Sequence, residues 1–133
     1  MLDGHRYLSL ATVRRNGVEV MTPVWFAAAD GKLYAFSAGD SGKVKRLRHT
    51  PRVRLAPCDA RGRVRGAWLD GTGRILTESP AIERARAALR AKYGWQMRLL
   101  DLFSWLAGRI QRRAWIEIEV SPPAPPVERA RRD

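Results

Sequence analysis

Cysteine and histidine are scarce in this chain of 133 residues. The single cysteine is Cys58, and the two histidines are His5 and His49. One cysteine excludes an intramolecular disulfide and a thiolate metal cluster. Neither histidine has a second histidine, a cysteine or a carboxylate at ligand spacing, which argues against a catalytic metal site.

Acidic residues are also few in comparison with basic ones. The chain has 13 Asp and Glu but 25 Lys and Arg, so its formal net charge is +12. Such an excess predicts an acidic partner or ligand. Because arginine greatly outnumbers lysine, a compositional bias toward arginine is an alternative explanation of the same surplus.

No apolar run is long enough to cross a membrane. The most apolar stretch, residues 96–108, is short and carries Arg98 and Asp101. Residues 1–4 lack the basic start and apolar run of a signal peptide. We therefore expect a cytoplasmic protein without a membrane partner.

Familiar catalytic motifs are missing as well. Gly71-x-Gly73 lacks the third glycine of a dinucleotide fingerprint, and Gly42-Lys43 lacks the Ser or Thr that follows in a P-loop. The G-x-S-x-G nucleophile elbow does not occur. If the protein is an enzyme, a cofactor must therefore carry the reaction.

Alternating apolar and polar residues predict a mainly β fold. Asn16-Gly17 and Asp30-Gly31 predict hairpin turns, the first of type I′, which needs positive φ at both central positions. Gly71 interrupts the fifth strand as a turn or a bulge. The expected strands cover residues 5–14, 18–28, 33–37, 52–58, 64–77 and 113–120.

Helical spacing appears in three places. A short helix follows Asp40 or Ser41 as N-cap, with Val44 and Leu47 on one side. Ser79-Pro80 opens a second helix as cap and first-turn proline, and residues 96–108 form a third, whose wide apolar surface predicts burial against a sheet or another subunit. Six or seven antiparallel strands with these helices predict a small β-barrel over residues 1–120, and the Pro-rich residues 121–133 predict a disordered tail.

The cations of the short helix lie at its start, where the helix dipole is already positive. Lys43 and Lys45 fall in this region, and each added cation costs a few tenths of a kcal/mol there. An anion at this end would offset that cost. Free backbone N–H groups, the Ser37 and Ser41 hydroxyls and the Lys43 ammonium predict a phosphate cradle. A solvated basic helix is the alternative interpretation.

Two blocks of sequence resemble a known superfamily. TPVWF (residues 22–26) and LYAFSAGDSGKVKRLRHTPRVRLAPCDARGRVRG (residues 33–66) are similar to the pyridoxamine 5′-phosphate oxidase-like, FMN-binding split β-barrel proteins. The likeness is strongest to the actinobacterial oxidoreductases that use the deazaflavin coenzyme F420. It implies a homodimer of split barrels with cofactor clefts at the subunit interface.

The resemblance also implies which residues hold the cofactor. The phosphate site matches the loop and helix start, and the ring system matches the second strand. Arg48 and Arg54 extend the positive field. The implied residues are Ser37, Ser41, Gly42, Lys43, Lys45, Met21, Thr22, Pro23, Val24, Trp25, Arg48 and Arg54.

The chain departs from the family pattern in two respects. Family members commonly have residues before the first strand, which begins here near His5. The arginine that flavin-binding oxidases carry beside the phosphate-binding lysine matches Gly42. This glycine disfavours FMN and favours a different phosphate geometry. Separately, the poly-glutamate tail of coenzyme F420 suits a surface rich in arginine.

Several functions remain compatible with these residues. The first hypothesis is a coenzyme F420-dependent oxidoreductase that transfers a hydride to or from a small organic substrate, and the second replaces F420 with FMN. A cofactor carrier without turnover would use the same cradle. Remoter hypotheses are single-stranded nucleic-acid binding through Arg52, Arg54, Arg61, Arg63, Arg65 and Trp68, and heme binding through His5 or His49.

Overall fold

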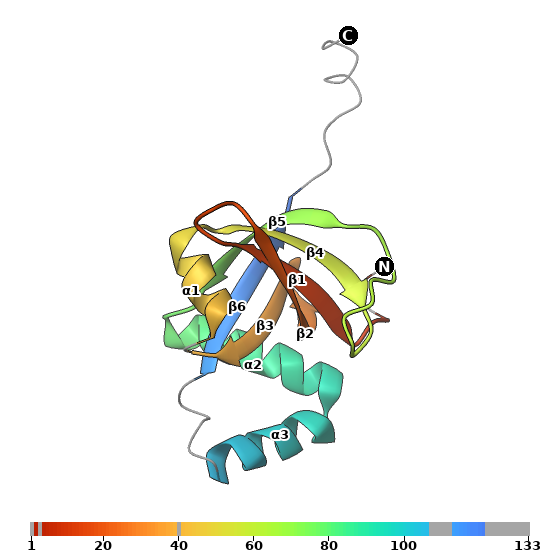
Figure 1. Ribbon diagram of the computed structural model, residues 1–133. Coiled ribbons are helices and arrows are strands. Elements are labelled where there is room, and N and C mark those ends of the chain that lie inside the picture. The colour runs from red at the N-terminus through yellow and green to blue at the C-terminus, as the bar shows by residue number, and fades with distance from the viewer. Residues whose placement is uncertain (1, 3, 40, 107–112, 122–133) are drawn as a thin grey trace.

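Six antiparallel strands close into a barrel in the computed structural model (Figure 1), which describes residues 2, 4–39, 41–106 and 113–121. The order of strands around the barrel is β1-β2-β3-β6-β5-β4. The expected antiparallel barrel with six strands is thus confirmed. The elements are β1 (Tyr7–Val13), β2 (Glu19–Ala29), β3 (Lys32–Ala38), α1 (Gly42–His49), β4 (Arg52–Cys58), β5 (Leu69–Ile75), α2 (Ser79–Tyr93), α3 (Trp95–Leu106) and β6 (Arg113–Val120).

The barrel interior is filled by alternate residues of its strands. Leu8 and Leu10 of β1 lie there with Phe26 of β2 and Ile116 of β6, all of them almost fully buried. Leu47 of α1 belongs to the same apolar cluster. The short helix is therefore anchored in the barrel core.

β2 separates from β3 over most of its length. It pairs with β1 over residues 19–25, but with β3 only over residues 26–29. One edge of residues 19–25 is therefore free of a described strand partner. This gap in an otherwise closed barrel leaves backbone hydrogen-bonding groups for another partner.

The two hairpins differ in their turns. Asp30 and Gly31 both have positive φ (53° and 77°), as a type I′ turn requires. The type I′ expectation for Asn16-Gly17 is wrong, because Gly17 has positive φ (88°) while Asn16 does not. The Gly17 N–H donates to the Arg14 carbonyl at 2.9 Å, which makes a three-residue loop that ends in a left-handed glycine.

The expected long strand over residues 64–77 is also wrong. Val64 makes only an isolated bridge to Cys58, and β5 begins at Leu69. Gly71 lies inside β5, neither in a turn nor opposite an extra residue, paired with Val53 and Val120. A Cβ on it would lie 3.0 Å from the Glu119 carbonyl oxygen, so close packing explains this glycine.

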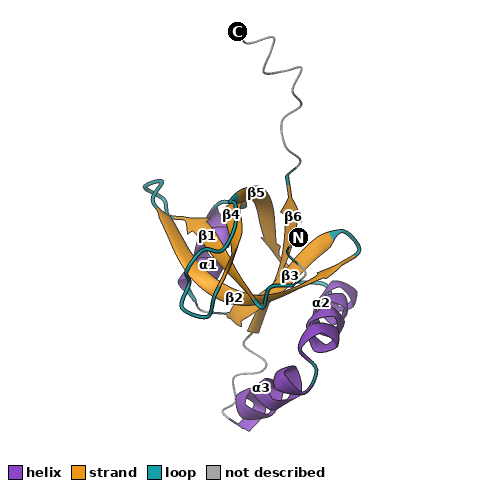
Figure 2. Cartoon of the chain, turned by 90° about the vertical axis from the view of Figure 1, so that its right-hand side faces the viewer, coloured by secondary structure: helices purple, strands orange, loops and turns teal. Residues whose placement is uncertain are grey.

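α2 covers the outer face of the barrel over β2, β3 and β6 (Figure 2). Its cap is Glu78, which makes no side-chain capping bond, so the expected cap at Ser79 is wrong by one residue. The Tyr93 hydroxyl donates to the Arg6 carbonyl (2.6 Å) and accepts from the Phe26 N–H (3.1 Å). Burial raises the pKa of Tyr93 to about 12.

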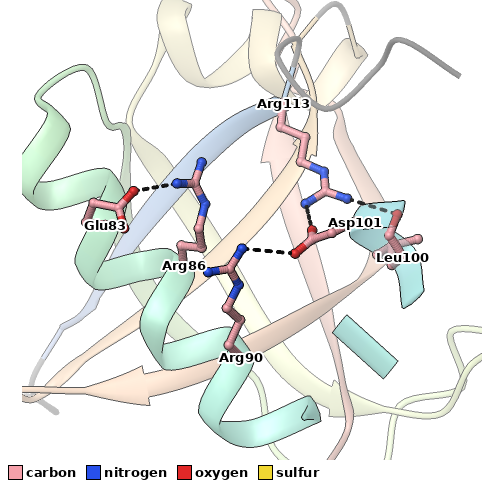
Figure 3. Close-up of polar contacts among 6 residues, drawn as sticks. All are labelled: Glu83, Arg86, Arg90, Leu100, Asp101 and Arg113. Carbon is pink, nitrogen blue, oxygen red and sulfur yellow. Dashed lines mark hydrogen bonds and ion pairs between the residues drawn. The ribbon is translucent and has the colours of Figure 1, made fainter. Parts of the chain in front are cut away.

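α3 is tied to the rest of the chain by an acidic side chain (Figure 3). The Asp101 carboxylate accepts from Arg113 of β6 at 2.5 Å and from Arg90 of α2 at 3.4 Å. Arg113 also donates to the Leu100 carbonyl at 3.5 Å. Because the Arg113 and Asp101 side chains are largely buried, this ion pair fixes the start of β6 against α3.

The other face of α3 is exposed and apolar. Met97 is buried, but six large apolar residues of the helix are 44–71% exposed: Trp95, Leu99, Leu102, Phe103, Trp105 and Leu106. The expected burial of this helix against a sheet is therefore wrong within one chain.

None of the helices in the described ranges is long and apolar enough to cross a bilayer. Of the expected tail over residues 121–133, residues 122–133 lie outside the described residues.

A buried carboxylate links three strands across the outer face. Glu117 accepts hydrogen bonds from Arg74 (2.9 Å), Tyr34 (3.2 Å) and Lys32 (3.5 Å). Burial by itself raises the pKa of Glu117, but the hydrogen bond and charge of Arg74, helped by Lys32 and Tyr34, hold it below the ordinary 4.5. Glu117 therefore stabilises the fold above that pH, and the contribution is lost as the pH falls through the folded-state pKa.

We predict that Glu117→Gln reduces the acid sensitivity of the fold. Because the amide cannot titrate, the free energy of unfolding of the variant should fall less steeply than that of the wild type below pH 4.5. Denaturant unfolding at a series of pH values measures this difference. Glu119→Gln, an exposed change on the same strand, is the control. Parallel curves for wild type and Glu117→Gln would contradict the prediction.

Candidate functional site

The residues of the expected phosphate cradle lie where β3 ends and α1 begins. Ser41 is the N-cap of α1, and its Oγ accepts from the Val44 N–H at 3.4 Å. The Ser37 hydroxyl donates to the Ser41 Oγ at 3.0 Å. The structure thus brings the two predicted hydroxyls together beside the free N–H groups of the first helical turn.

Lys43 lies against these hydroxyls. Its ammonium donates to the Ser37 Oγ at 3.1 Å. Burial, with a smaller effect from the charge of Arg46, lowers the pKa of Lys43. Among the residues that the structure describes, no carboxylate forms an ion pair with Lys43. A partly buried ammonium in this setting is stabilised by an anion.

Arg46 lies near Lys43, and the sequence patterns did not single it out. Its Nε donates to the Oγ1 of the buried Thr12 at 2.6 Å. Gly42 lies one turn earlier, and a Cβ there would be 2.7 Å from the Arg46 Nη1. Residues 42 and 46 share a helix face because they are four apart, and this spacing is the signal that could have found Arg46.

A polar atom on β2 has no partner. The Thr22 Oγ1 is buried and makes no hydrogen bond within the described residues. Thr22 pairs with Leu10 of β1, on the part of β2 that has separated from β3. An orphaned hydroxyl is uncommon in a folded protein and indicates a missing donor or acceptor, such as a ligand.

The predicted ring-binding residues divide between two faces of β2. Val24 is buried in the barrel core, whereas Met21 and Pro23 are exposed on the opposite face. Trp25 follows on that outer face and stacks on Tyr93, with ring centroids 4.5 Å apart. Met21, Pro23 and Trp25 therefore form an outer row along which a flat ring could lie, while Val24 supports the strand from inside.

The remaining predicted cations are placed differently. Lys45 and Arg48 are exposed on α1. Arg54 lies on β4, where it pairs with Glu19 at 2.9 Å and covers the Trp68 ring with its guanidinium carbon 5.0 Å from the centroid. Arg54 is thus engaged by an acid outside the cradle.

The residues of the nucleic-acid-binding and heme-binding hypotheses lie in separate places, and some of them contact other side chains of the protein. His49 is exposed at the end of α1 and His5 lies before β1. The described residues contain no group of three His, Cys, Asp or Glu side chains that could hold a metal ion. Arg65 pairs with Asp59 at 3.3 Å, and Trp68 lies beneath Arg54.

A family model described as pyridoxamine 5′-phosphate oxidase matches residues 1–121. The chain belongs to this family. A search of curated proteins found no match. Membership agrees with the resemblance carried by residues 22–26 and 33–66, while the F420-dependent group is narrower than the family model.

Solved structures of this family's fold show the same barrel. The hypothetical protein Rv2991 of Mycobacterium tuberculosis is 23% identical, with 90% of this chain and 76% of that chain covered and a TM-score of 0.67. HutZ, the heme storage protein of Vibrio cholerae, is 13% identical over 90% and 84% of the two chains (TM-score 0.69). An FAD-binding protein of Mesorhizobium loti is 20% identical over 91% and 83% (TM-score 0.62). At these identities the likeness shows the fold alone.

The residues present fit the phosphate of a flavin-type cofactor. Lys43 and Arg46 supply positive charge, and Ser37 and Ser41 supply hydroxyls. These are the donors that phosphate oxygens require. Within the described residues, no group of three His, Cys, Asp or Glu side chains that could hold a metal ion lies here or elsewhere.

Proposed function

We propose that the protein is an oxidoreductase that binds a phosphate-bearing deazaflavin or flavin coenzyme, with coenzyme F420 as the first hypothesis and FMN as the second. The observation that carries this proposal is the cradle itself. Lys43 is partly buried beside two hydroxyls and a second cation, and no described carboxylate neutralises it. A coenzyme phosphate would supply the missing negative charge.

The bound coenzyme would supply hydride transfer, which no side chain of the site can perform. The chain's own contribution is binding and orientation. Met21, Pro23 and Trp25 lie on one face of β2, since alternate residues of a strand share a face. β2 can therefore hold the ring along this row while the cradle holds the phosphate.

Exposed cations beyond the cradle favour coenzyme F420 over FMN. Lys45 and Arg48 are exposed on α1 and form no ion pair with a described carboxylate. FMN ends at its phosphate, whereas coenzyme F420 continues into a chain of carboxylates. Such a chain could meet these cations, with a contribution that depends on salt.

We predict that Lys43→Ala weakens coenzyme binding by about 1.5–3 kcal/mol, the range for a hydrogen bond assisted by charge. Fluorescence titration with coenzyme F420 and with FMN measures both affinities. Arg15→Ala, which removes an exposed cation from the β1–β2 turn, is the control and should leave both unchanged.

Three results would count against the proposal or one part of it. Equal affinity of wild type and Lys43→Ala would remove Lys43 from the site. Failure of F420 to bind more tightly than FMN would reject the first hypothesis in favour of the second. Reduced coenzyme that is held but never oxidised by any of a panel of organic electrophiles would indicate a carrier instead of an enzyme.

We further propose that two copies of the chain associate through the exposed face of α3. Aromatic side chains bury about 150–250 Å² each, so three exposed aromatic residues together with three exposed leucines offer an apolar face of several hundred Å² per chain. A standard protein interface buries about 800 Å² on each partner.

A second copy would also cover the apolar pocket of about 280 Å³ between Trp25 and α3. That pocket adjoins the proposed ring-binding strand and suits a small uncharged substrate.

Charges on this face should separate the two copies. We predict that Leu102→Glu combined with Leu106→Glu converts a dimer into a monomer, because carboxylates one turn apart cannot be buried without partners. Sedimentation velocity measures the mass. Val64→Glu is the control, because it places a carboxylate at an exposed apolar residue away from α3, between β4 and β5. This variant should remain dimeric. A monomeric wild type, or a double variant that stays dimeric, would contradict the proposal.

A further inference from the structure

The Arg46 guanidinium occupies the space of a side chain at position 42. A Cβ built on Gly42 would lie 2.7 Å from Nη1, 3.5 Å from Cζ and 3.6 Å from Nη2 of Arg46. Arg46 therefore projects backward over the first turn of α1, rather than outward into solvent. Only a residue without a side chain at position 42 leaves this path open.

Thr12 fixes the orientation of that guanidinium. Its Oγ1 accepts from the Arg46 Nε at 2.6 Å, and Thr12 is 1% exposed at the end of β1. With Nε engaged, the two terminal nitrogens are left for another acceptor. A pair of parallel N–H donors matches two oxygens of a phosphate.

The electrostatic surroundings of Arg46 are unfavourable for a cation. Burial and the charge of Arg14 lower the pKa of Arg46, and Lys43 lies beside it at a helix start. Within the described residues, no carboxylate forms an ion pair with Arg46 or Lys43. Two neighbouring cations and the positive end of a helix repel one another unless an anion lies between them.

We propose that Arg46 is the second phosphate-binding cation of this chain, reaching from the second helical turn into the place that Gly42 leaves empty. Thr12 is its positioning residue. This inference rests on the proposed function, since it assigns a residue to the same coenzyme site. It also reverses one conclusion from the sequence, because a glycine at position 42 no longer means a missing arginine.

The experiment compares ligands that differ by their phosphate. FMN and riboflavin share one ring system, and coenzyme F420 and 7,8-didemethyl-8-hydroxy-5-deazariboflavin share another. Arg46→Met should lower the affinity for FMN or F420 by about tenfold or more, the effect of losing one charge-assisted bond. The affinity for the phosphate-free ligand of the same pair should not change. Arg15→Met is the matched control and should change neither. Equal losses for both members of a pair, or no loss, would overturn the proposal.

A rescue variant separates binding from a merely structural role. Arg46→Met vacates the space beside residue 42, so Gly42→Arg in that background should regain at least part of the affinity for the phosphate-bearing ligand. Gly42→Ala alone should lower the affinity for that ligand without loss of stability, because its Cβ displaces only the flexible end of the Arg46 side chain. This variant tests the proposal even if Arg46→Met fails to fold. No effect of Gly42→Ala on the affinity would overturn the proposal.

Inorganic phosphate distinguishes failure of this inference from failure of the proposed function. If the wild type binds neither coenzyme, the proposed function is wrong, but thermal unfolding in phosphate against chloride of equal ionic strength still reports on the cradle. The melting temperature of the wild type should rise in phosphate, and that of Gly42→Ala and Arg46→Met should rise less. Equal shifts in all three proteins would overturn the assignment of Arg46.

Discussion

The burial of Leu47 in the barrel core determines where the cations of α1 lie. Leu47 packs with the inward residues of the strands, and Gly73 makes room for it, since a Cβ there would be 3.1 Å from a Leu47 methyl group. With the helix anchored on that side, Lys43 faces Ser37 and Arg46 faces Thr12. An eight-residue helix is marginal alone, so core packing, rather than helix propensity, holds the cradle.

The separation of β2 from β3 complements this anchoring. Closing the barrel through residues 26–29 alone leaves the first part of β2 with a free edge and an orphaned Thr22 hydroxyl. Pro23 lies in this segment, where its missing N–H disrupts no pairing with β3. In the proposed function, the free edge and the cradle together bind an elongated, anionic, ring-bearing ligand, which is the chemistry of a flavin-type coenzyme.

Local patterns predicted five of the six strands, the short helix and the grouping of Ser37, Ser41 and Lys43, because alternation and capping depend on neighbours in sequence. Contacts across the barrel were not predictable in this way. Gly71 looked like a turn because its neighbours in β4 and β6 are far away in the chain. Arg46 looked like one more surface cation, since its partner Thr12 is 34 residues distant. The exposed apolar face of α3 has no partner within the described residues of one chain. Local sequence patterns do not identify the surface that binds it.

The most direct test of this account is a crystal structure of the protein with coenzyme F420 or FMN bound. We expect the phosphate within hydrogen-bonding distance of the Lys43 Nζ and the Ser41 hydroxyl, with the ring along the outer row of Met21, Pro23 and Trp25. A phosphate bound elsewhere, with the start of α1 open to bulk water, would contradict the account.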